Sequence, residues 1–270
     1  MSLPDIQSGS DFRGIDLDHV GISNLRYPVT FSDGELTQSG VADIEMTVGL
    51  PAAHRGTHMS RMVEITHEHL QDLDPRTIGT ILKVASTRLD VPTVALQVAM
   101  PISAEVQSPV SGATSWQAHD LVVRATLRHS QISVETAIAS EVTSVCPCSK
   151  AISDYGAHNQ RSRITLTTIG EGDWPYPISA TESIELIRAS GSCPVLPLVK
   201  RPDERAVTMR AHDKPMFVED MARDLSTVIR KRHVSHRIEI RNFESIHSHD
   251  AVARLTWRNP ASASARHNSS

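Results

Sequence analysis

The sequence predicts an α+β protein of two similar modules, each an antiparallel sheet with helices on one face. Apolar residues alternate in several strand-like segments, and apolar residues at helical spacing mark helices between them. The order strands, helix, strands then occurs twice along the 270 residues. Because strands and helices do not alternate one by one, a doubly wound parallel sheet is not expected. Antiparallel sheets with exposed edges often pair further, so we expect an oligomer.

The first module is predicted to cover residues 39–130. Residues 1–38 mix Gly, Asp and Ser with isolated apolar residues, and we expect them to extend over the surface or over a neighbouring subunit. Asp74 followed by Pro75 is typical of a helix start. The predicted elements of this module are strands over 44–50, 94–100 and 121–127 and a helix with apolar residues at 78–89.

The second module is predicted to cover residues 131–258. Ser179 and Glu182 have the spacing of a capping box, and Gly191 suits the end of that helix. A tail at 259–270, rich in Ser and Ala, is expected to be disordered. The other predicted elements are strands over 132–138, 164–166, 238–240 and 251–257 and a helix over 217–229.

Composition and charge restrict the class of protein. The formal net charge of −4 provides no general attraction for nucleic acid. No apolar run approaches the roughly 20 residues of a membrane helix, and the polar segment 1–11 does not resemble a signal peptide. We therefore expect a cytoplasmic protein with neither nucleic-acid nor membrane partners. Three cysteines, two of them two residues apart, fit reduced thiols used for chemistry better than disulfides.

The strongest local signal is Cys-Pro-Cys-Ser-Lys at 146–150, where a predicted strand leads into a loop. A thiolate near neutral pH needs a neighbouring positive charge, which Lys150 or a metal ion can supply. Two thiols at this spacing do not complete a structural zinc site. The alternative is a pair of small, inert, half-buried cysteines, and spacing alone does not decide between the two.

Other polar segments offer further ligands. His158 lies in the same connection as the cysteines, and His247 and His249 would share one face of a strand. Together with carboxylates, thiols and imidazoles suit a borderline metal ion. For each segment alone, a surface histidine or a polar loop is the better explanation. The charged run at 200–205 fits a solvated loop, and the acids at 217–220 fit the first turn of a helix.

Seven short blocks carry a more specific signal when they are taken together. They are Leu-Arg-Tyr-Pro at 25–28, Arg-Gly-Thr-His-Met-Ser-Arg at 55–61, Cys-Pro-Cys-Ser-Lys at 146–150, Tyr-Gly-Ala-His-Asn-Gln-Arg-Ser at 155–162, Lys-Arg-Pro-Asp-Glu at 200–204, Phe-Val-Glu-Asp at 217–220 and Asn-Phe-Glu-Ser-Ile-His at 242–247. In this order they resemble the prokaryotic type IB GTP cyclohydrolase I family.

The resemblance implies a bimodular tunnelling fold (T-fold) that assembles into a barrel-like homotetramer. It also implies a hydrolase that converts GTP and water to 7,8-dihydroneopterin triphosphate and formate. That reaction is the first step of folate and pterin biosynthesis and also leads to deazaguanine nucleosides. In this family, hydroxide from a metal-bound water adds at guanine C8 and the imidazole ring then opens.

The resemblance also implies a set of site residues. Cys146 corresponds to the thiolate ligand of the metal, and Glu204 and His247 correspond to its other protein ligands. His158 corresponds to a further ligand or a proton-transfer group, and Cys148 to a second cysteine near the reacting carbon. A carboxylate ligand makes Zn²⁺, Mn²⁺ and Fe²⁺ all suitable. No organic cofactor is expected.

Substrate contacts are expected from a carboxylate and a group of cations. Glu219 corresponds to the residue that accepts hydrogen bonds from guanine N1 and N2, while Glu244 joins His158 as a candidate for proton transfer. The candidates for binding the triphosphate are Arg61, Lys150, Arg161, Lys200 and Arg201.

Two alternatives remain at this stage. One is a different tunnelling-fold enzyme, either an archaeal-type cyclohydrolase that makes a cyclic phosphate or an NADPH-dependent nitrile reductase. The blocks containing Glu204 and His247 argue against the reductase, which needs no metal ligands. The other is a non-catalytic metal-binding protein, which would leave Glu219 without a purpose.

Overall fold

The computed structural model describes residue 7 and residues 9–260, so residues 261–270 of the predicted disordered tail lie outside the described residues. The chain forms two compact units with interleaved sequences. Unit 1 comprises the residues up to Met100 together with residues 122–136 and 170–176. Unit 2 comprises residues 101–121, residues 137–169 and the residues from 177 onward. The predicted boundaries of the two modules, 39–130 and 131–258, stay a prediction.

The described residues form six helices and ten strands, in agreement with the predicted α+β class. The helices are α1 (Met59–His69), α2 (Ile78–Leu89), α3 (Pro147–Ile152), α4 (Ala180–Ser190), α5 (Arg201–Asp213) and α6 (Val218–Arg230). The strands are β1 (Leu17–Ser32), β2 (Thr37–Leu50), β3 (Asp72–Leu73), β4 (Thr93–Gln107), β5 (Thr114–Arg128), β6 (Gln131–Val145), β7 (Asn159–Glu171), β8 (Cys193–Pro194), β9 (Ser235–Asn242) and β10 (Ala251–Trp257).

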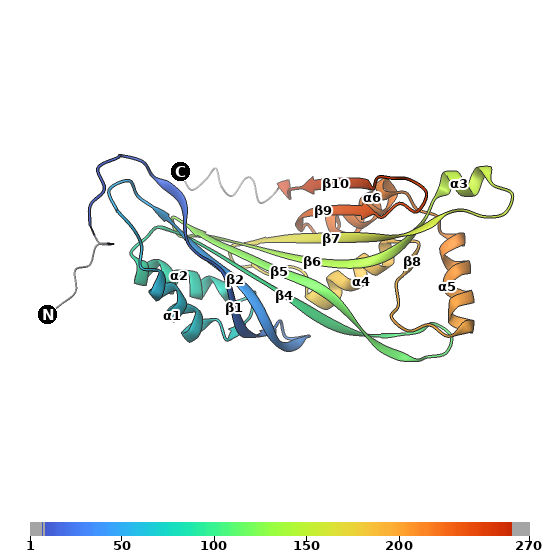
Figure 1. The fold of residues 1–270 in the computed structure, drawn as a ribbon, viewed down its shortest axis with the longest axis horizontal. Coiled ribbons are helices and arrows are strands. Elements are labelled where there is room, and N and C mark those ends of the chain that lie inside the picture. The colour runs from blue at the N-terminus through green and yellow to red at the C-terminus, as the bar shows by residue number, and fades with distance from the viewer. Residues whose placement is uncertain (1–6, 8, 261–270) are drawn as a thin grey trace. The chain divides into compact units, whose positions relative to one another are not determined.

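The strands are hydrogen-bonded in the order β10-β9-β7-β6-β5-β4-β2-β1-β3, and β8 pairs with β6 (Figure 1). The pairs β1–β2, β2–β4, β7–β9 and β9–β10 are antiparallel, as the sequence predicts, whereas the short β3 runs parallel to β1. Among the described residues, none of the helices combines the length and hydropathy that a membrane span requires.

Strand β1 corrects the expectation that residues 1–38 merely extend over a surface. It pairs with β2 over most of its 16 residues. Its register with β2 shifts twice, between Leu17 and Val20 and between Ile22 and Leu25, and Asn24 has a positive φ of 57°. Each shift moves the apolar side chains to the other face, so the strand lacks the continuous alternation by which strands are recognised.

The core of unit 1 follows from the alternation in β2. Ile44, Met46 and Val48 point to one face and are almost fully buried, and Phe31 of β1 is also fully buried. Helices α1 and α2 pack against each other, and α1 contacts β1 (Figure 1). Their buried residues recur at helical spacing, so both helices present one apolar face.

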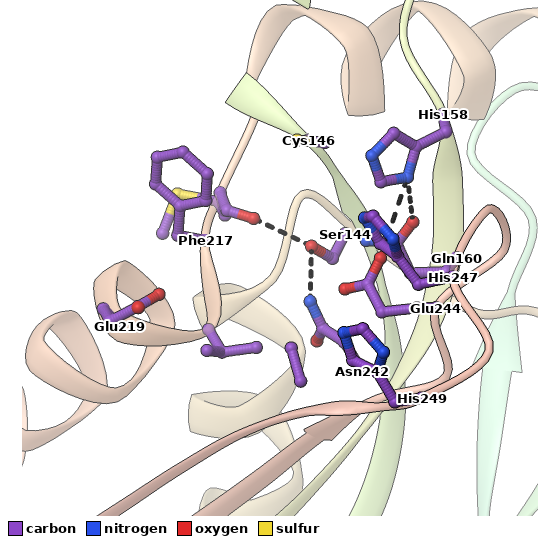
Figure 2. A pocket seen from close by; sticks show the side chains of 13 residues that line it. Ser144, Cys146, His158, Gln160, Phe217, Glu219, Asn242, Glu244, His247 and His249 are labelled. Carbon is purple, nitrogen blue, oxygen red and sulfur yellow. Dashed lines mark hydrogen bonds and ion pairs between the residues drawn. The ribbon is translucent and has the colours of Figure 1, made fainter. Parts of the chain in front are cut away.

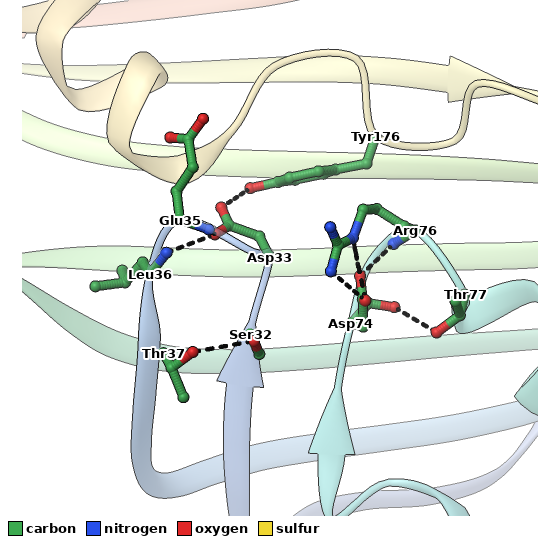
Figure 3. Close-up of polar contacts among 9 residues, drawn as sticks. All are labelled: Ser32, Asp33, Glu35, Leu36, Thr37, Asp74, Arg76, Thr77 and Tyr176. Carbon is green, nitrogen blue, oxygen red and sulfur yellow. Dashed lines mark hydrogen bonds and ion pairs between the residues drawn. The ribbon is translucent and has the colours of Figure 1, made fainter.

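Asp33 fixes the turn between β1 and β2. Its Oδ1 accepts hydrogen bonds from the backbone N–H groups of Glu35 and Leu36 at 3.0 and 2.8 Å. Its Oδ2 accepts a hydrogen bond from the Tyr176 hydroxyl at 2.7 Å (Figure 3). Since Asp33 is only 5% exposed, these bonds satisfy a buried carboxylate and hold residues 170–176 against the turn within unit 1.

The first predicted helix starts later than expected. Asp74 does not cap it: its Oδ1 accepts the backbone N–H of Arg76 at 2.9 Å, and its carboxylate pairs with the Arg76 guanidinium (Figure 3). Helix α2 instead follows Thr77 and begins at Ile78. The Asp-Pro pair thus forms a turn that is closed by the Asp74 side chain. When an Asp side chain bonds to the backbone of a turn in this way, it is not available to cap a helix.

In unit 2, α6 packs against β9 and β10, and α4 packs against α6 (Figure 1). The predicted cap of α4 is confirmed, because Ser179 Oγ accepts the N–H of Glu182 at 3.1 Å and Gly191 follows the last turn. Helix α6 buries Met221, Leu225 and Ile229 along one face.

The charged segment at 200–205, expected to be a solvated loop, begins helix α5. Asp203 is fully buried and organises the helix start. Its carboxylate accepts hydrogen bonds from the N–H groups of Lys200, Val110 and Ser111 and from the Ser111 hydroxyl, all between 2.6 and 2.9 Å. These bonds hold the pKa of Asp203 well below its ordinary value, with the bond from the Ser111 hydroxyl the largest cause.

Candidate active site

The cysteine segment forms the start of a short helix rather than the expected loop. Strand β6 ends at Val145, Cys146 occupies the N-cap position, and Pro147 opens α3. The Cys146 Sγ atom accepts the N–H of Ser149 at 3.4 Å, and Lys150 N–H bonds to the Cys146 carbonyl at 3.1 Å. Proline suits the first helical position because it lacks the N–H that would otherwise be unpaired there.

A pocket of about 270 Å³ in unit 2 brings together several of the predicted residues. Cys146 lines it from the end of β6, and His158 lies just before β7. Glu244 and His247 come from the loop between β9 and β10, and Glu219 comes from the first turn of α6. Figure 2 shows the Glu219 side chain well apart from His158, His247 and Glu244, which lie close together.

His158 is held in place by side-chain contacts. Its Nδ1 lies 2.8 Å from Gln160 Oε1 and 3.9 Å from Glu244 Oε2. The His158 and Glu244 side chains are only 13% and 10% exposed. Because an amide oxygen can only accept, the bond to Gln160 places the proton on Nδ1 and leaves Nε2 with a free lone pair when the ring is neutral.

The loop after β9 adds a histidine pair to the pocket wall. The ring centroids of His247 and His249 lie 5.2 Å apart with an interplanar angle of 21°, and the His247 ring meets that of His158 edge-on at 6.4 Å. Phe243 N–H bonds to the Arg161 carbonyl at 2.9 Å and ties the loop to β7. Three imidazoles therefore lie along one side of the pocket (Figure 2).

A chain of buried hydrogen bonds forms the floor of the pocket. The Ser162 hydroxyl donates to Asn242 Oδ1 at 2.6 Å, and Asn242 Nδ2 donates to Ser144 Oγ at 3.2 Å. Ser144 Oγ donates in turn to the Met216 carbonyl at 2.8 Å (Figure 2). This chain connects β7, β9 and β6 to the residues just before α6, and so to the helix turn that carries Glu219.

Sequence reasoning missed these floor residues and also missed Gln160 as a partner of His158. Gln160, Ser162 and Asn242 lie inside the recognised blocks at 155–162 and 242–247, but their side chains carry no ligand or acid–base signal. Ser144 and Ser162 are single polar residues inside strands, where buried and exposed positions look alike. Only the hydrogen-bond partners distinguish them.

The predicted metal ligand Glu204 does not line this pocket. It is exposed on the first turn of α5, next to the buried Asp203. Cys148 is exposed on α3 and also lies outside the pocket lining. Their predicted roles stay predictions.

The predicted triphosphate cations lie on separate elements. Lys150 Nζ donates to the His212 carbonyl near the end of α5, and Arg161 pairs with Glu141 at 3.4 Å. Lys200 precedes α5 and Arg201 opens it. Arg61 lies on α1 in unit 1, where its guanidinium donates to the Arg88 carbonyl at 3.4 Å. None of the five lines the pocket.

The donor atoms along the pocket suit a borderline divalent metal ion. A thiol, three imidazoles and the Glu244 carboxylate are the ligand types that Zn²⁺ and related ions take. Within residues 7 and 9–260, however, no group of three or more His, Cys, Asp and Glu side chains has converged to the geometry of a metal site. The chemistry of the donor set itself fits a metal ion.

The fold resembles that of solved uricases. The crystal structure of uricase from Arthrobacter globiformis aligns with a TM-score of 0.52 over 90% of this chain and 94% of that chain, at 7% sequence identity. At this identity the likeness concerns the fold alone, and it confirms the predicted tunnelling fold.

Sequence comparison gives a closer relationship. The chain is 38% identical over 258 residues to GTP cyclohydrolase FolE2 of Neisseria gonorrhoeae, covering 95% of this chain and 99% of that protein. It is likewise 38% identical to GTP cyclohydrolase FolE2 of Herminiimonas arsenicoxydans, covering 93% and 96%. The model of the family described as type I GTP cyclohydrolase folE2 matches residues 3–253. The chain therefore belongs to the type I GTP cyclohydrolase folE2 family.

Proposed function

We propose that this protein is a GTP cyclohydrolase of type IB that converts GTP and water to 7,8-dihydroneopterin triphosphate and formate. The observation that carries the proposal is the family relationship across 95% of the chain. The pocket supports it, because a thiol and three imidazoles lie along it and a carboxylate suited to guanine lines it from α6. The proposed place of the reaction is the first step of folate and pterin synthesis.

Cys146, His158 and His247 are the proposed metal-binding residues at the pocket. When bound there, a divalent Zn, Mn or Fe ion would supply an activated water at neutral pH. Cys146 is well placed for this, since it lines the pocket and its sulfur accepts the N–H of Ser149. Glu204 is proposed as a further ligand on the basis of its sequence block alone.

His158 and Glu244 are the proposed groups for moving protons. The Gln160 amide fixes the His158 tautomer, so that Nε2 can accept a proton or bind a metal. Glu244 lies 3.9 Å from Nδ1 of the same ring and would stabilise the imidazolium once it formed. Both side chains are largely buried, which keeps bulk water away from this pair.

Glu219 is the proposed anchor for the guanine base. It lies in the first turn of α6, where its charge is favourable beside the helix N-terminus. A carboxylate there can accept two hydrogen bonds from guanine N1–H and the N2 amino group. Cys148 is proposed to face the substrate, and Arg61, Lys150, Arg161, Lys200 and Arg201 are proposed to bind its triphosphate.

A direct assay tests the proposed reaction. The purified protein is freed of metal with a chelator, supplied with Zn²⁺, Mn²⁺ or Fe²⁺, and given GTP. Formate release and the fluorescence of the oxidised pterin are then measured. We expect both products with at least one of the metals and neither without metal. Failure to obtain either product with any of the three ions would contradict the proposal.

The role of Glu219 is tested by Glu219→Ala. Losing an acceptor of two hydrogen bonds should weaken GTP binding by about a hundredfold or more, while the bound metal content stays unchanged. Asp224→Ala is the matched control, because Asp224 is an exposed acid on the same helix that does not line the pocket. If Glu219→Ala lost its metal instead, Glu219 would be a ligand and not the guanine anchor.

A further inference from the structure

A second cavity in unit 2 has no part in the proposed reaction. It measures about 130 Å³ and is bounded by α4, β8 and α5. Arg188 of α4, Cys193 of β8 and Arg210 of α5 line it, together with apolar residues such as Leu196 and Val207. It shares no lining residue with the candidate active site, so a ligand in one cavity would not touch the lining of the other.

The lining of this cavity is positively charged. It includes two arginines and no Asp or Glu. The Arg188 side chain is only 15% exposed, and its Nη1 pairs at 3.0 Å with Glu185, whose own side chain is 64% exposed. Arg188 Nε is buried and has no hydrogen-bond partner among the described residues. Leaving a buried charged donor unpaired is costly, so the cavity lacks an acceptor at this position.

The neighbouring titratable groups do not supply that acceptor. Burial raises the pKa of the Cys193 thiol, an effect that the positive charges of Arg210 and Lys214 only partly oppose, so the thiol stays neutral. Burial and the charge of Arg188 lower the pKa of His119 to about 4, so His119 is also neutral at pH 7. Neither group carries a negative charge that could balance the two guanidinium groups.

We propose that this cavity is a binding site for a small oxyanion, either a carboxylate or a phosphate. A guanidinium group offers paired N–H donors that match the oxygens of both anions. Apolar residues also line the cavity, and less polar surroundings strengthen that attraction. The cavity has about half the volume of the candidate active site, which suits a small anion.

Cys193 provides a direct reporter for this site, because its thiol lines the cavity. The full-length protein is incubated with N-ethylmaleimide in chloride, acetate or phosphate at equal ionic strength, and alkylation of each cysteine is followed by peptide mass spectrometry. We expect saturating acetate or phosphate to slow Cys193 alkylation about tenfold, because a bound anion blocks access until it leaves. The exposed Cys148 is the internal reference for reagent activity.

Substitution of the arginines decides between site binding and a general salt effect. Arg210 is exposed, and Arg210→Gln removes one charge-assisted hydrogen bond to the anion. It should therefore raise the anion concentration that gives half-maximal protection of Cys193 about tenfold. Arg188→Gln should do the same, and thermal unfolding checks that it is folded. Arg205→Gln is the control, because Arg205 is exposed on α5 but does not line the cavity. Equal Cys193 alkylation in all three salts, or equal protection in Arg210→Gln and Arg205→Gln, would overturn the proposal.

Discussion

At the scale of single residues, the pocket combines groups that the sequence singles out with groups that it does not. The blocks around Cys146, His158, Glu219 and His247 predict those four residues as site residues, and all four line one pocket. Their individual roles stay predictions. Glu204 shows why: its block is as specific as the others, but whether a helical side chain faces the pocket depends on how the helix packs.

Gln160 is predicted to matter through His158. In Gln160→Leu the His158 Nδ1 proton loses its 2.8 Å acceptor, so the ring can adopt either tautomer and either orientation. We expect kcat/KM for GTP to fall by roughly 10- to 100-fold, as for other residues that orient a ligand histidine. Steady-state kinetics measure this, and Gln131→Leu at an exposed end of β6 is the control. An unchanged kcat/KM would show that His158 needs no such partner.

Asn242 is predicted to hold the pocket floor. Asn242→Ala removes both hydrogen bonds that connect Ser162 to Ser144 and leaves two buried hydroxyls with fewer partners. We expect a loss of about 1–3 kcal/mol in the free energy of unfolding, measured with urea. Asn159→Ala, at an exposed position in β7, should change it by less than about 0.5 kcal/mol. A small loss for Asn242→Ala would mean that the floor relaxes without cost.

At the scale of elements, the sequence predicts best those segments whose pattern is uninterrupted. Strands β2 and β4 alternate cleanly, and Ser179 caps α4 as predicted. Strand β1 was missed because its register shifts break the alternation. Helix α5 was missed because it starts in a run of charges and its buried anchor, Asp203, bonds to Val110 and Ser111, about ninety residues earlier in the chain.

Strand β5 carries a buried histidine that should make stability depend on pH. In the folded protein the pKa of His119 is about 4, below the ordinary 6.5, because burial and Arg188 disfavour the charged ring. The unfolded chain therefore binds more protons than the folded one between these values. Stability contributed by neutral His119 is complete above pH 6.5 and falls as the pH drops towards 4.

The variant His119→Leu tests this dependence. It should unfold at a urea midpoint that changes less between pH 7 and pH 4.5 than that of the unaltered protein. His212→Leu is the control, because His212 is exposed on α5. Some dependence should remain in His119→Leu, since burial also lowers the pKa of His236. If the urea midpoint changed equally with pH in the unaltered protein and in His119→Leu, His119 would have the same pKa in the folded and unfolded states.

At the scale of the whole molecule, the resemblance predicts a homotetramer. In the strand order of the described residues β10 stands at one end, so its outer backbone groups are available to pair with another strand. We expect sedimentation equilibrium to give four times the chain mass of 29.6 kDa. A mass of 29.6 kDa at micromolar concentration would contradict it.

The interleaving of the two units has a consequence for how the gene can be altered. Each unit collects three separate stretches of the chain, and strands β4 to β7 each contribute residues to both. No single cut in the coding sequence separates one unit from the other. The two units therefore cannot be exchanged separately between related genes. A nonsense mutation anywhere before the last strands would truncate unit 2 and leave an incomplete protein. New segments would have to enter at its turns, where the chain is exposed.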